Sequence, residues 1–175
     1  MRMLFEIDKK DYGECTHTFR RDSARGIIIR DGKVAMIHSL KYGYYKFPGG
    51  GIEKGESFIE AMIRETREEA GLVVRPESVR EYGCVHRIQA GDEDPTECFV
   101  QDNYYFLCDA EDGSVSRNLD DYEEEEGFTP EFADPVSAIR INRTVKGCPK
   151  HLVMQEREAR VLEMLISEGL IGQEK

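Results

Sequence analysis

The sequence lacks any long apolar segment. None of its apolar runs approaches the ~18 residues that a membrane-spanning helix requires. The first residues reach the charged side chains of Glu6 and Asp8 without the apolar stretch of a signal peptide. From these absences we expect a cytoplasmic protein that does not associate with membranes.

Cysteine is scarce, and its spacing is not that of a metal site. The five cysteines are far apart and include no C-x-x-C pair: Cys15, Cys84, Cys98, Cys108 and Cys148. A dispersed, odd-numbered set is not typical of a disulfide framework or a zinc site. We therefore expect reduced thiols.

Basic residues are outnumbered by acidic ones. The chain has 24 Lys and Arg against 35 Asp and Glu, which gives a formal net charge of −11 and a pI near 4.9. Such a charge argues against binding to nucleic acids or anionic membranes through bulk charge. It does not exclude an enzyme that handles phosphates through metal ions, because a bound cation reverses the local charge.

Length and pattern favour one mixed α/β domain over residues 1–175. The 39% of hydrophobic residues suffice for one core. Asp31-Gly32 between two apolar runs predicts a hairpin. The predicted strands cover 23–30, 33–39, 79–89 and 97–108, and helices are predicted over 58–70, 136–141 and 150–169. Residues 110–127 hold eight acids against one base, which predicts a solvated loop.

The helix over 58–70 has clear end signals and a crowded acidic side. Ser57 and Glu60 form an S-x-x-E capping box, and Gly71 stands at the C-terminal end. Three further glutamates at i, i+3 and i+4 share one side of this helix: Glu65, Glu68 and Glu69. Each like-charge pair costs roughly 0.2–0.5 kcal/mol, and of the three only Glu68 has a basic partner at helical spacing, Arg64. A hard divalent cation would remove this repulsion, since Mg²⁺ prefers carboxylate oxygens.

The surrounding residues resemble the motif of the Nudix hydrolase family. From Gly50 to Leu72 the chain matches G-x₅-E-x₇-R-E-U-x-E-E-x-G-U, where U is a bulky apolar residue, at all seven fixed Gly, Glu and Arg positions. The one departure is Thr66 at a U position. Thr66 lies on the core side of the helix, so we expect it to pack there.

The resemblance implies a fold, a reaction and a cofactor. The family fold is an α/β/α sandwich with a mixed, curved sheet, and its members use Mg²⁺ or Mn²⁺ to cleave a diphosphate linkage in nucleotide-type substrates. It implies metal ligands at Glu68 and Glu69, and a ligand or catalytic base at Glu65. By the same resemblance, Glu56 belongs to the metal shell, Arg64 orients a glutamate, and Gly50 or Gly49 offers a backbone carbonyl.

Weaker expectations concern the substrate and a further carboxylate. Tyr45 or Phe47, just before the glycines, could stack on a base, and Lys46 could contact a phosphate. Some family members take another carboxylate from a later loop, and residues 123–126 could supply it, although a solvated charge run is the simpler reading. The expected partner is a small nucleotide-type molecule, and a homodimer is left open.

Three alternatives remain at this point. The first is an isomerase of a prenyl diphosphate on the same scaffold, which would need a cysteine and a glutamate beside the metal. The second is a non-catalytic regulator that binds nucleotides; such proteins commonly lose motif glutamates, and this chain keeps all four. The third is an acidic interaction protein whose 110–127 segment binds a basic partner.

Overall fold

The structure is a computed structural model that describes residues 1–91, 94 and 96–172. The last three residues of the domain predicted over 1–175 therefore lie outside the described residues. The strands are β1 (Met3–Asp8), β2 (His17–Arg20), β3 (Ser23–Ile27), β4 (Ile29–Arg30), β5 (Lys33–Ser39), β6 (Tyr45–Lys46), β7 (Gly49–Gly51), β8 (Arg80–Ala90), β9 (Glu97–Leu107) and β10 (Phe128–Ala133). The helices are α1 (Phe58–Ala70), α2 (Asp121–Glu126), α3 (Pro135–Thr144) and α4 (Leu152–Ser167), with 3₁₀ turns at Pro76–Ser78 and Pro149–His151.

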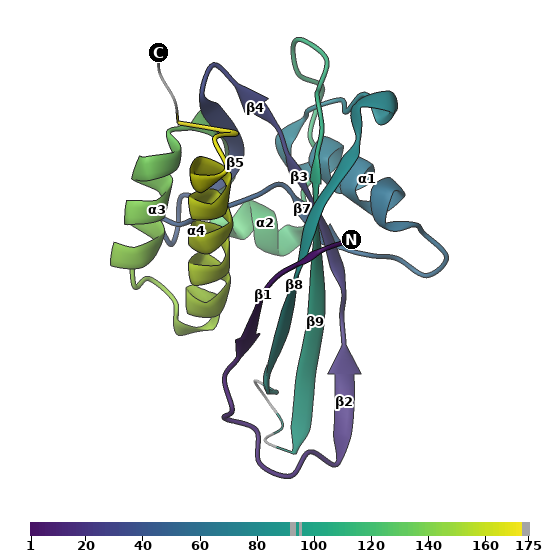
Figure 1. Cartoon of the computed structure of the whole chain (residues 1–175), viewed down its shortest axis with the longest axis vertical. Coiled ribbons are helices and arrows are strands. Elements are labelled where there is room, and N and C mark those ends of the chain that lie inside the picture. Colours follow the sequence, from purple (N-terminus) through teal and green to yellow (C-terminus); the bar gives the residue numbers. More distant parts are fainter. Residues whose placement is uncertain (92–93, 95, 173–175) are drawn as a thin grey trace.

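A mixed sheet and an antiparallel sheet lie between α1 on one side and the α3–α4 pair on the other (Figure 1). One sheet has six strands in the order β1-β8-β9-β3-β7, with β2 paired to β9, and the other has four in the order β10-β5-β4, with β6 paired to β5. Strands β1 and β8, β2 and β9, and β3 and β9 run parallel, whereas the remaining pairs are antiparallel. This is the expected α/β/α sandwich.

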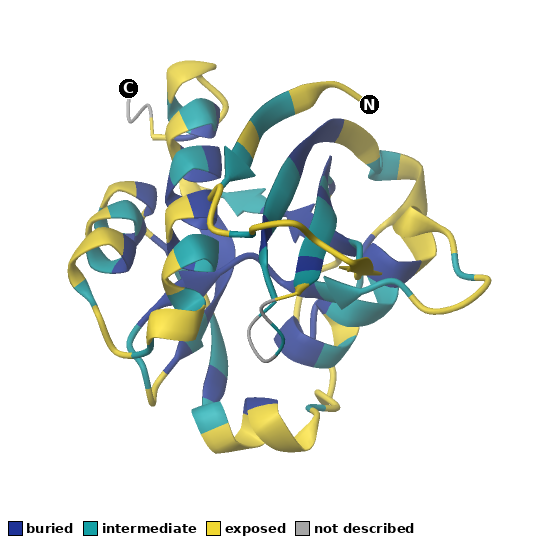
Figure 2. Ribbon diagram, turned by 90° about the horizontal axis from the view of Figure 1, so that it is seen from below, coloured by how far each residue is buried: buried dark blue, intermediate teal, exposed yellow. Residues whose placement is uncertain are grey.

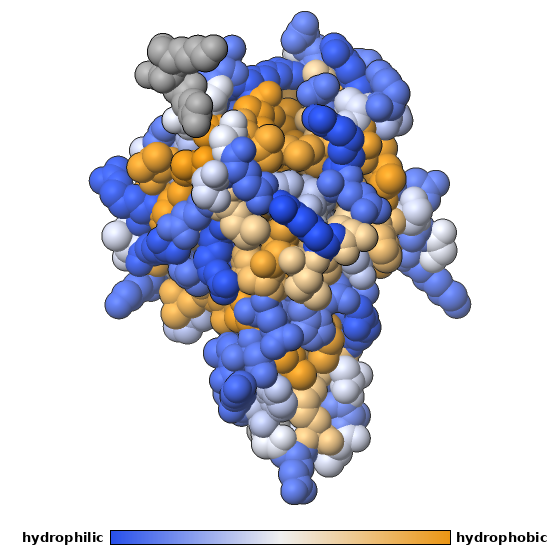
Figure 3. All heavy atoms as spheres, viewed as in Figure 1, coloured by the Kyte–Doolittle hydropathy of each residue, from blue (hydrophilic) through white to orange (hydrophobic). Residues whose placement is uncertain are grey.

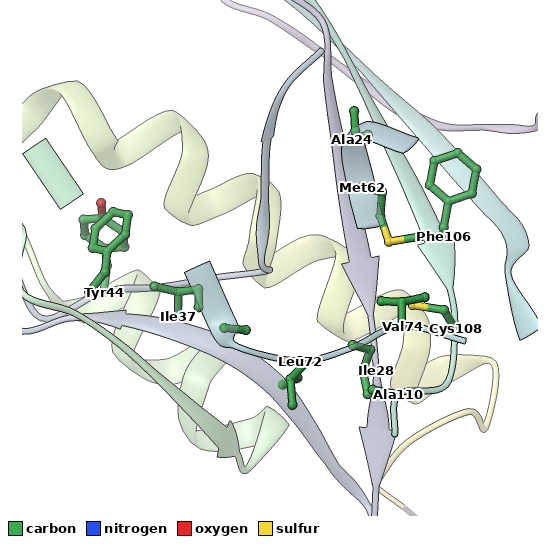
Figure 4. Packing of buried hydrophobic residues seen from close by; sticks show 14 residues of the cluster. Ala24, Ile28, Ile37, Tyr44, Met62, Leu72, Val74, Phe106, Cys108 and Ala110 are labelled. Carbon is green, nitrogen blue, oxygen red and sulfur yellow. The ribbon is translucent and has the colours of Figure 1, made fainter. Parts of the chain in front are cut away.

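The core is divided into two clusters by the sheets. The first packs α1 onto β3 and β9, and Figure 4 shows Met62 and Phe106 pointing toward one another within it. The second lies under α4, whose inner side is buried (Figure 2). Thr66 is fully buried in α1, as expected, and its hydroxyl contacts the Met62 sulfur. A Cβ at Gly26 would lie 2.9 Å from the Thr66 hydroxyl oxygen, so glycine lets α1 approach β3 closely.

The local sequence signals are confirmed. The hairpin turns at Asp31 and Gly32, both with positive φ, and α1 covers the residues predicted, with the Ser57–Glu60 capping box and a left-handed Gly71. The other predicted helices and strands lie within a few residues of their expected bounds. Five strands went unpredicted because they are short or pair with distant segments: β1, β2, β6, β7 and β10.

A long β-ribbon projects from the body, and we call it the arm (Figure 1). It consists of β2, residues 97–100 of β9 and residues 87–90 of β8, held by the β2–β9 and β8–β9 pairings. Figure 3 shows apolar side chains exposed along this ribbon between polar ones. Phe19 of β2, which is 48% exposed, belongs to the arm.

The expectation that all cysteines are reduced is wrong. Cys15 and Cys98 form a disulfide, because the parallel pairing of β2 with β9 brings their Cα atoms within 5.6 Å. Their separation of 83 residues left no sign in the sequence. Disulfides are uncommon in the cytosol, so the Cys15–Cys98 bond does not support the predicted cytoplasmic location, which stays a prediction. Within the described part of the chain, no helix combines the length and apolarity needed to span a membrane.

Candidate active site

The glycine segment of β7 lies between β3 and α1 and admits no side chains. Gly49 has a φ of +143°, and a Cβ there would lie 2.2 Å from the Ala24 carbonyl oxygen. At Gly50 a Cβ would lie 2.5 Å from the carboxylate of Glu65. Glycine is thus required at Gly49, and at Gly50 it lets a motif glutamate lie directly against the backbone.

Arg64 organises three of the motif glutamates. Its Nε and Nη2 donate to the two carboxylate oxygens of Glu56 at 2.8 and 2.9 Å, and its Nη1 donates to Glu65 at 2.8 Å and Glu68 at 3.0 Å. Its Nη2 also reaches the Gly51 carbonyl. The planar guanidinium fixes carboxylate orientation through such paired bonds. The bonds from Arg64 are the main reason that the pKa of Glu56 is lowered.

The pKa of Glu65 is shifted in the opposite direction from that of Glu56. Burial raises its pKa, although the hydrogen bond and charge of Arg64 act against this. Only 15% of its side chain is exposed, compared with 34% for Glu68. Glu68 is therefore the most solvent-accessible of the three glutamates on this side of α1, and it has the most freedom to change its orientation.

Glu69 lies apart from the Arg64 cluster, in the interior. Lys46 Nζ donates to its Oε1 at 2.6 Å, and the Gly49 N–H donates to its Oε2 at 2.9 Å. Burial raises the pKa of Glu69 to about 7, with a further contribution from the neighbouring Glu123, while Lys46 opposes the rise. Sequence spacing left Glu65 and Glu69 without basic partners, but in the fold Arg64 contacts Glu65 and Lys46 contacts Glu69. Repulsion alone therefore does not require a cation.

The acid-rich 110–127 segment is not simply a solvated loop. Asp120 and Glu123 form a capping box at the start of α2, and Gly127 ends the helix in a left-handed conformation. Glu123 turns inward and is 4% exposed, whereas Glu125 stays in solvent and pairs with Lys41. The D-x-x-E pattern of Asp120 and Glu123, followed by Gly127, is typical of a short helix. The number of acidic residues alone does not indicate this helix.

Glu69 and Glu123 are close enough for each to affect the pKa of the other. Burial acts to raise the pKa of Glu123, but the hydrogen bond with Glu69 and the Asp120 N–H outweigh it, and the net shift is downward. The pKa values of the two neighbouring carboxyl groups therefore shift in opposite directions. Tyr122 Oη donates to the Glu123 carboxylate at 2.9 Å and helps to keep it ionised.

Two of the four motif glutamates, Glu65 and Glu68, border a cleft of about 410 Å³, which we call the acidic cleft. Five carboxylate side chains line it, against two arginines, Arg21 and Arg64: Glu53, Glu65, Glu68, Asp120 and Glu123. Hard oxygen donors of this kind suit Mg²⁺ or Mn²⁺. Among residues 1–91, 94 and 96–172, no three His, Cys, Asp or Glu side chains are already arranged to hold a metal ion. The donor set fits a divalent cation, provided that Glu68 turns from Arg64.

A second cleft, of about 360 Å³, lies on the other side of the glycine segment between the arm and the start of α4. We call it the arm cleft. Its lining is basic and aromatic, and it includes Gly49–Gly51, Lys46 and Arg21. Arg21 lines both clefts, so the two are adjacent.

Two of the three residues predicted to contact substrate are core residues instead. Phe47 is fully buried, and its ring packs edge-on against that of Tyr105 with 5.7 Å between the ring centroids. Tyr45 is 8% exposed, and its hydroxyl donates to Glu131 at 2.6 Å. Neither ring offers a free face for a base, because the strand β6 turns both away from the clefts. Lys46 does line the arm cleft, where it is paired with Glu69.

Comparison with known proteins places this arrangement in a family. The model of the NUDIX domain matches residues 20–146. The chain belongs to the Nudix hydrolase family. The match includes β3, the glycine segment, α1 and the acidic helix α2, which are the elements that form the acidic cleft.

Curated Nudix relatives match over part of their length. An RNA pyrophosphohydrolase of Shewanella piezotolerans is 38% identical over 93 residues, which are 47% of this chain and 52% of that protein. An ADP-ribose pyrophosphatase of Methanocaldococcus jannaschii is 39% identical over 57 residues, which are 31% and 34% of the two chains. The chain spans only about half, or less, of the length of these Nudix relatives.

Solved Nudix structures agree with the fold. A NUDIX hydrolase from Nitrosomonas europaea has a TM-score of 0.56 at 23% identity and covers 83% of this chain and 90% of its own. A MutT protein from Bacillus halodurans has a TM-score of 0.53 at 18% identity, with 69% and 72% covered. At this identity the likeness concerns the fold of the Nudix chain and not its substrate.

Proposed function

We propose that this Nudix protein is a metal-dependent pyrophosphohydrolase that cleaves the diphosphate linkage of a nucleotide-type substrate. The observation that carries the proposal is the acidic cleft, where Arg64 holds three motif glutamates beside a basic, aromatic cleft. The relatives named RNA pyrophosphohydrolase and ADP-ribose pyrophosphatase support this class of reaction. They differ in substrate, so nucleoside triphosphates, dinucleotides and sugar nucleotides all stay open.

Glu68 and Glu123 are the residues that would hold the metal, with Glu65 as a further ligand or as the base, and with Glu69 and Glu56 behind them. Glu69 is buried and bonded to Lys46 and Gly49, and Glu56 is gripped by Arg64. Bound Mg²⁺ or Mn²⁺ would neutralise the diphosphate and acidify the attacking water. The carbonyl of Gly50 was predicted as a further ligand, and its position beside the Glu65 carboxylate is compatible with that role.

Protein side chains supply orientation and a proton acceptor. Arg64 fixes Glu56 and Glu65 relative to the glycine segment, which reduces the reorganisation needed on substrate binding, while Glu68 is free to turn to the cation. Glu65 is our candidate base, because burial raises its pKa toward the range in which a carboxylate accepts protons well.

We expect water to attack phosphorus directly. The acidic cleft is lined by no serine, threonine, cysteine or histidine among the described residues, so these common nucleophiles are missing. A nucleoside triphosphate should then give nucleoside monophosphate and pyrophosphate, and a dinucleotide should be cut inside its diphosphate bridge. Hydrolysis in ¹⁸O-labelled water identifies the attacked phosphorus, and a trapped phosphoenzyme would contradict direct attack.

The structure weighs against the isomerase alternative. That chemistry needs a cysteine beside the metal, yet Cys84 is buried on β8 and Cys98 is bonded to Cys15 on the arm. Neither cysteine lines the acidic cleft. The regulator alternative predicts nucleotide binding without turnover.

The deciding experiment is a nucleotide panel. The purified protein is incubated with nucleoside triphosphates, dinucleotides and ADP-ribose in the presence of Mg²⁺ or Mn²⁺, and released monophosphate is measured. We expect turnover that excess chelator abolishes and added metal restores. Full activity in chelator, or binding with no hydrolysis of any member of the panel, would contradict the proposal.

A further inference from the structure

Strand β2 and the chain before it make few contacts with the rest of the protein. Residues 9–20 are exposed, apart from the half-buried Tyr12. The connection between β1 and β2 passes around the tip of the arm (Figure 1). In the part of the chain that the structure describes, β2 pairs with β9 and with no other strand. A strand with so little buried surface is held by a small number of identifiable interactions.

The two ends of β2 are attached to β9 in different ways. Two residues before the strand, Cys15 is bonded to Cys98 of β9. At the last residue of the strand, Arg20 forms an ion pair with Asp102 of β9. The ion pair does not depend on the oxidation state of the cysteines. Reduction of the disulfide should therefore loosen the beginning of β2 and leave its end attached.

The two bonded cysteines differ in exposure and in support. Cys15 is exposed, so a thiol can reach the bond from solvent. Cys98 is 4% exposed and lies opposite Ala90 in the β8–β9 pairing. That pairing keeps Cys98 in place when the bond opens, and Cys15 is the cysteine that can move away.

The position of β2 determines part of the arm cleft. Phe19 lies opposite Phe99 in the β2–β9 register, and both rings line this cleft with 6.1 Å between their centroids. Arg21, directly after β2, lines both the arm cleft and the acidic cleft. Displacement of β2 would therefore remove one wall of the arm cleft. The glutamates on α1 belong to a separate element and would stay in place.

We propose that the Cys15–Cys98 bond is a redox switch that controls the arm cleft. In the oxidised protein the bond keeps β2 against β9 and Phe19 in the wall of the cleft. In the reduced protein residues 9–19 separate from β9 and that wall is lost, while Arg20 keeps the end of β2 attached.

The reductant that the switch requires is a dithiol. One thiolate of the dithiol attacks the exposed Cys15 sulfur, the S–S bond breaks, and the Cys98 sulfur leaves as a thiolate that takes up a proton. The second thiolate of the dithiol then attacks its own sulfur in the mixed disulfide and releases Cys15 as a thiol. The dithiol becomes a cyclic disulfide, and two electrons and two protons pass to the protein. An oxidised dithiol reverses both steps.

The test compares amide hydrogen exchange in the oxidised protein and in the protein reduced with dithiothreitol, followed by mass spectrometry. Residues 9–19 should exchange about tenfold faster or more after reduction. Residues 58–70 of α1 and 152–167 of α4 should exchange at unchanged rates. Return to oxidised dithiothreitol should restore the slow exchange of residues 9–19.

Two variants connect the response to this bond. Cys15→Ser should exchange rapidly at residues 9–19 with or without dithiothreitol. Cys148→Ser, which alters a free cysteine, should keep the full response and is the matched control. A bond that stays intact in excess dithiothreitol, or unchanged exchange of residues 9–19 after reduction, would overturn the proposal. Faster exchange throughout α1 and α4 would show that the bond only stabilises the fold, which would also overturn it.

The effect on turnover rests on the proposed function. Reduction should raise KM about 3- to 10-fold, because the arm cleft adjoins the acidic cleft at Arg21. It should leave kcat within about twofold, because Arg64 still holds Glu65 and Glu68 on α1. Equal KM values in the two redox states would overturn the regulatory role. Hydrogen exchange needs no substrate, so a protein that hydrolyses no nucleotide would contradict the proposed function and leave the switch to be judged by exchange.

Discussion

The acidic cleft and the arm cleft share the glycine segment but are built in opposite ways. The acidic cleft draws Glu65 and Glu68 from one turn of α1, and both carboxylates are bonded to the side chain of Arg64. The arm cleft gathers residues from β2, β9, α2 and the start of α4, and several of its cations and rings face solvent. One site is held in a fixed arrangement by its own network, and the other is open to a partner.

Under the proposed function, this difference would separate chemistry from recognition. A reaction needs charged groups fixed to within a fraction of an ångström, and a local helix with a guanidinium clamp provides that. Recognition needs surface left uncovered, which segments from different parts of the chain can vary independently. Variants that alter one cleft should therefore leave the function of the other largely intact.

The largest expected effect comes from Glu68→Gln. It removes one charge from the acidic cleft, and kcat should fall about 100-fold or more because the cation is held less well. Glu68 is 34% exposed and shares Arg64 with two other carboxylates, so the free energy of unfolding without metal should change by less than ~0.5 kcal/mol. Steady-state kinetics and urea unfolding measure the two quantities. Glu124→Gln on the exposed side of α2 is the control, and a metal-free Glu68→Gln protein that unfolds readily would assign Glu68 a structural role.

The disulfide of the arm should matter for stability more than for catalysis. Cys15→Ser is expected to lower the free energy of unfolding by about 2–4 kcal/mol, because Cys15–Cys98 restricts the unfolded chain. Cys148→Ser, which alters a free cysteine, should have little effect. Thiol titration of the denatured, unreduced protein should find three free thiols, since two of the five cysteines are bonded. Five free thiols would contradict the pairing.

Glu123→Gln tests the link between α2 and the acidic cleft. Without the Glu123 charge, the pKa of Glu69 should fall below its value of about 7, because that neighbour contributes to the rise. Carboxyl ¹³C NMR of the metal-free protein follows this titration. The kcat should fall about 10- to 100-fold if Glu123 joins the metal shell. Glu125→Gln, in the same helix but exposed, should change neither quantity. An unaltered Glu69 titration in Glu123→Gln would contradict the contribution of Glu123 to the raised pKa of Glu69.

The smallest effect concerns the pH dependence of the Glu56–Arg64 contact. Arg64 lowers the pKa of Glu56 in the folded state below the ordinary value of 4.5. The resulting stability is present above pH 4.5 and is lost as the pH falls through the lowered pKa. Glu56→Gln should therefore destabilise the protein by about 1 kcal/mol at pH 7, and by progressively less in acid. Glu53→Gln serves as the control in urea unfolding at several pH values, and a difference that does not shrink in acid would contradict this account.

The sequence alone determined the parts of the protein that depend on near neighbours. Asp31-Gly32 set the hairpin, and Ser57, Glu60 and Gly71 set the ends of α1, because turns and caps are decided within four residues along the chain. The motif from Gly50 to Leu72 likewise identified the family, since its glutamates and Arg64 belong to one helix and the loop before it. The family model over residues 20–146 agrees with that reading.

Only the tertiary structure decided which distant side chains contact one another. Lys46 of β6 pairs with Glu69 of α1 across 23 residues, and Cys15 pairs with Cys98 across 83 beside the β2–β9 pairing, and periodicity encodes neither contact. The inward turn of Glu123 and the full burial of Phe47 were equally beyond a count of charges or aromatics. The arm cleft combines residues of β2 and β9 with residues at the start of α4, which are far apart in the sequence. Burial and charge pairing between distant segments are properties of the packed chain, and they set the pKa of Glu69 and the surface left for a ligand.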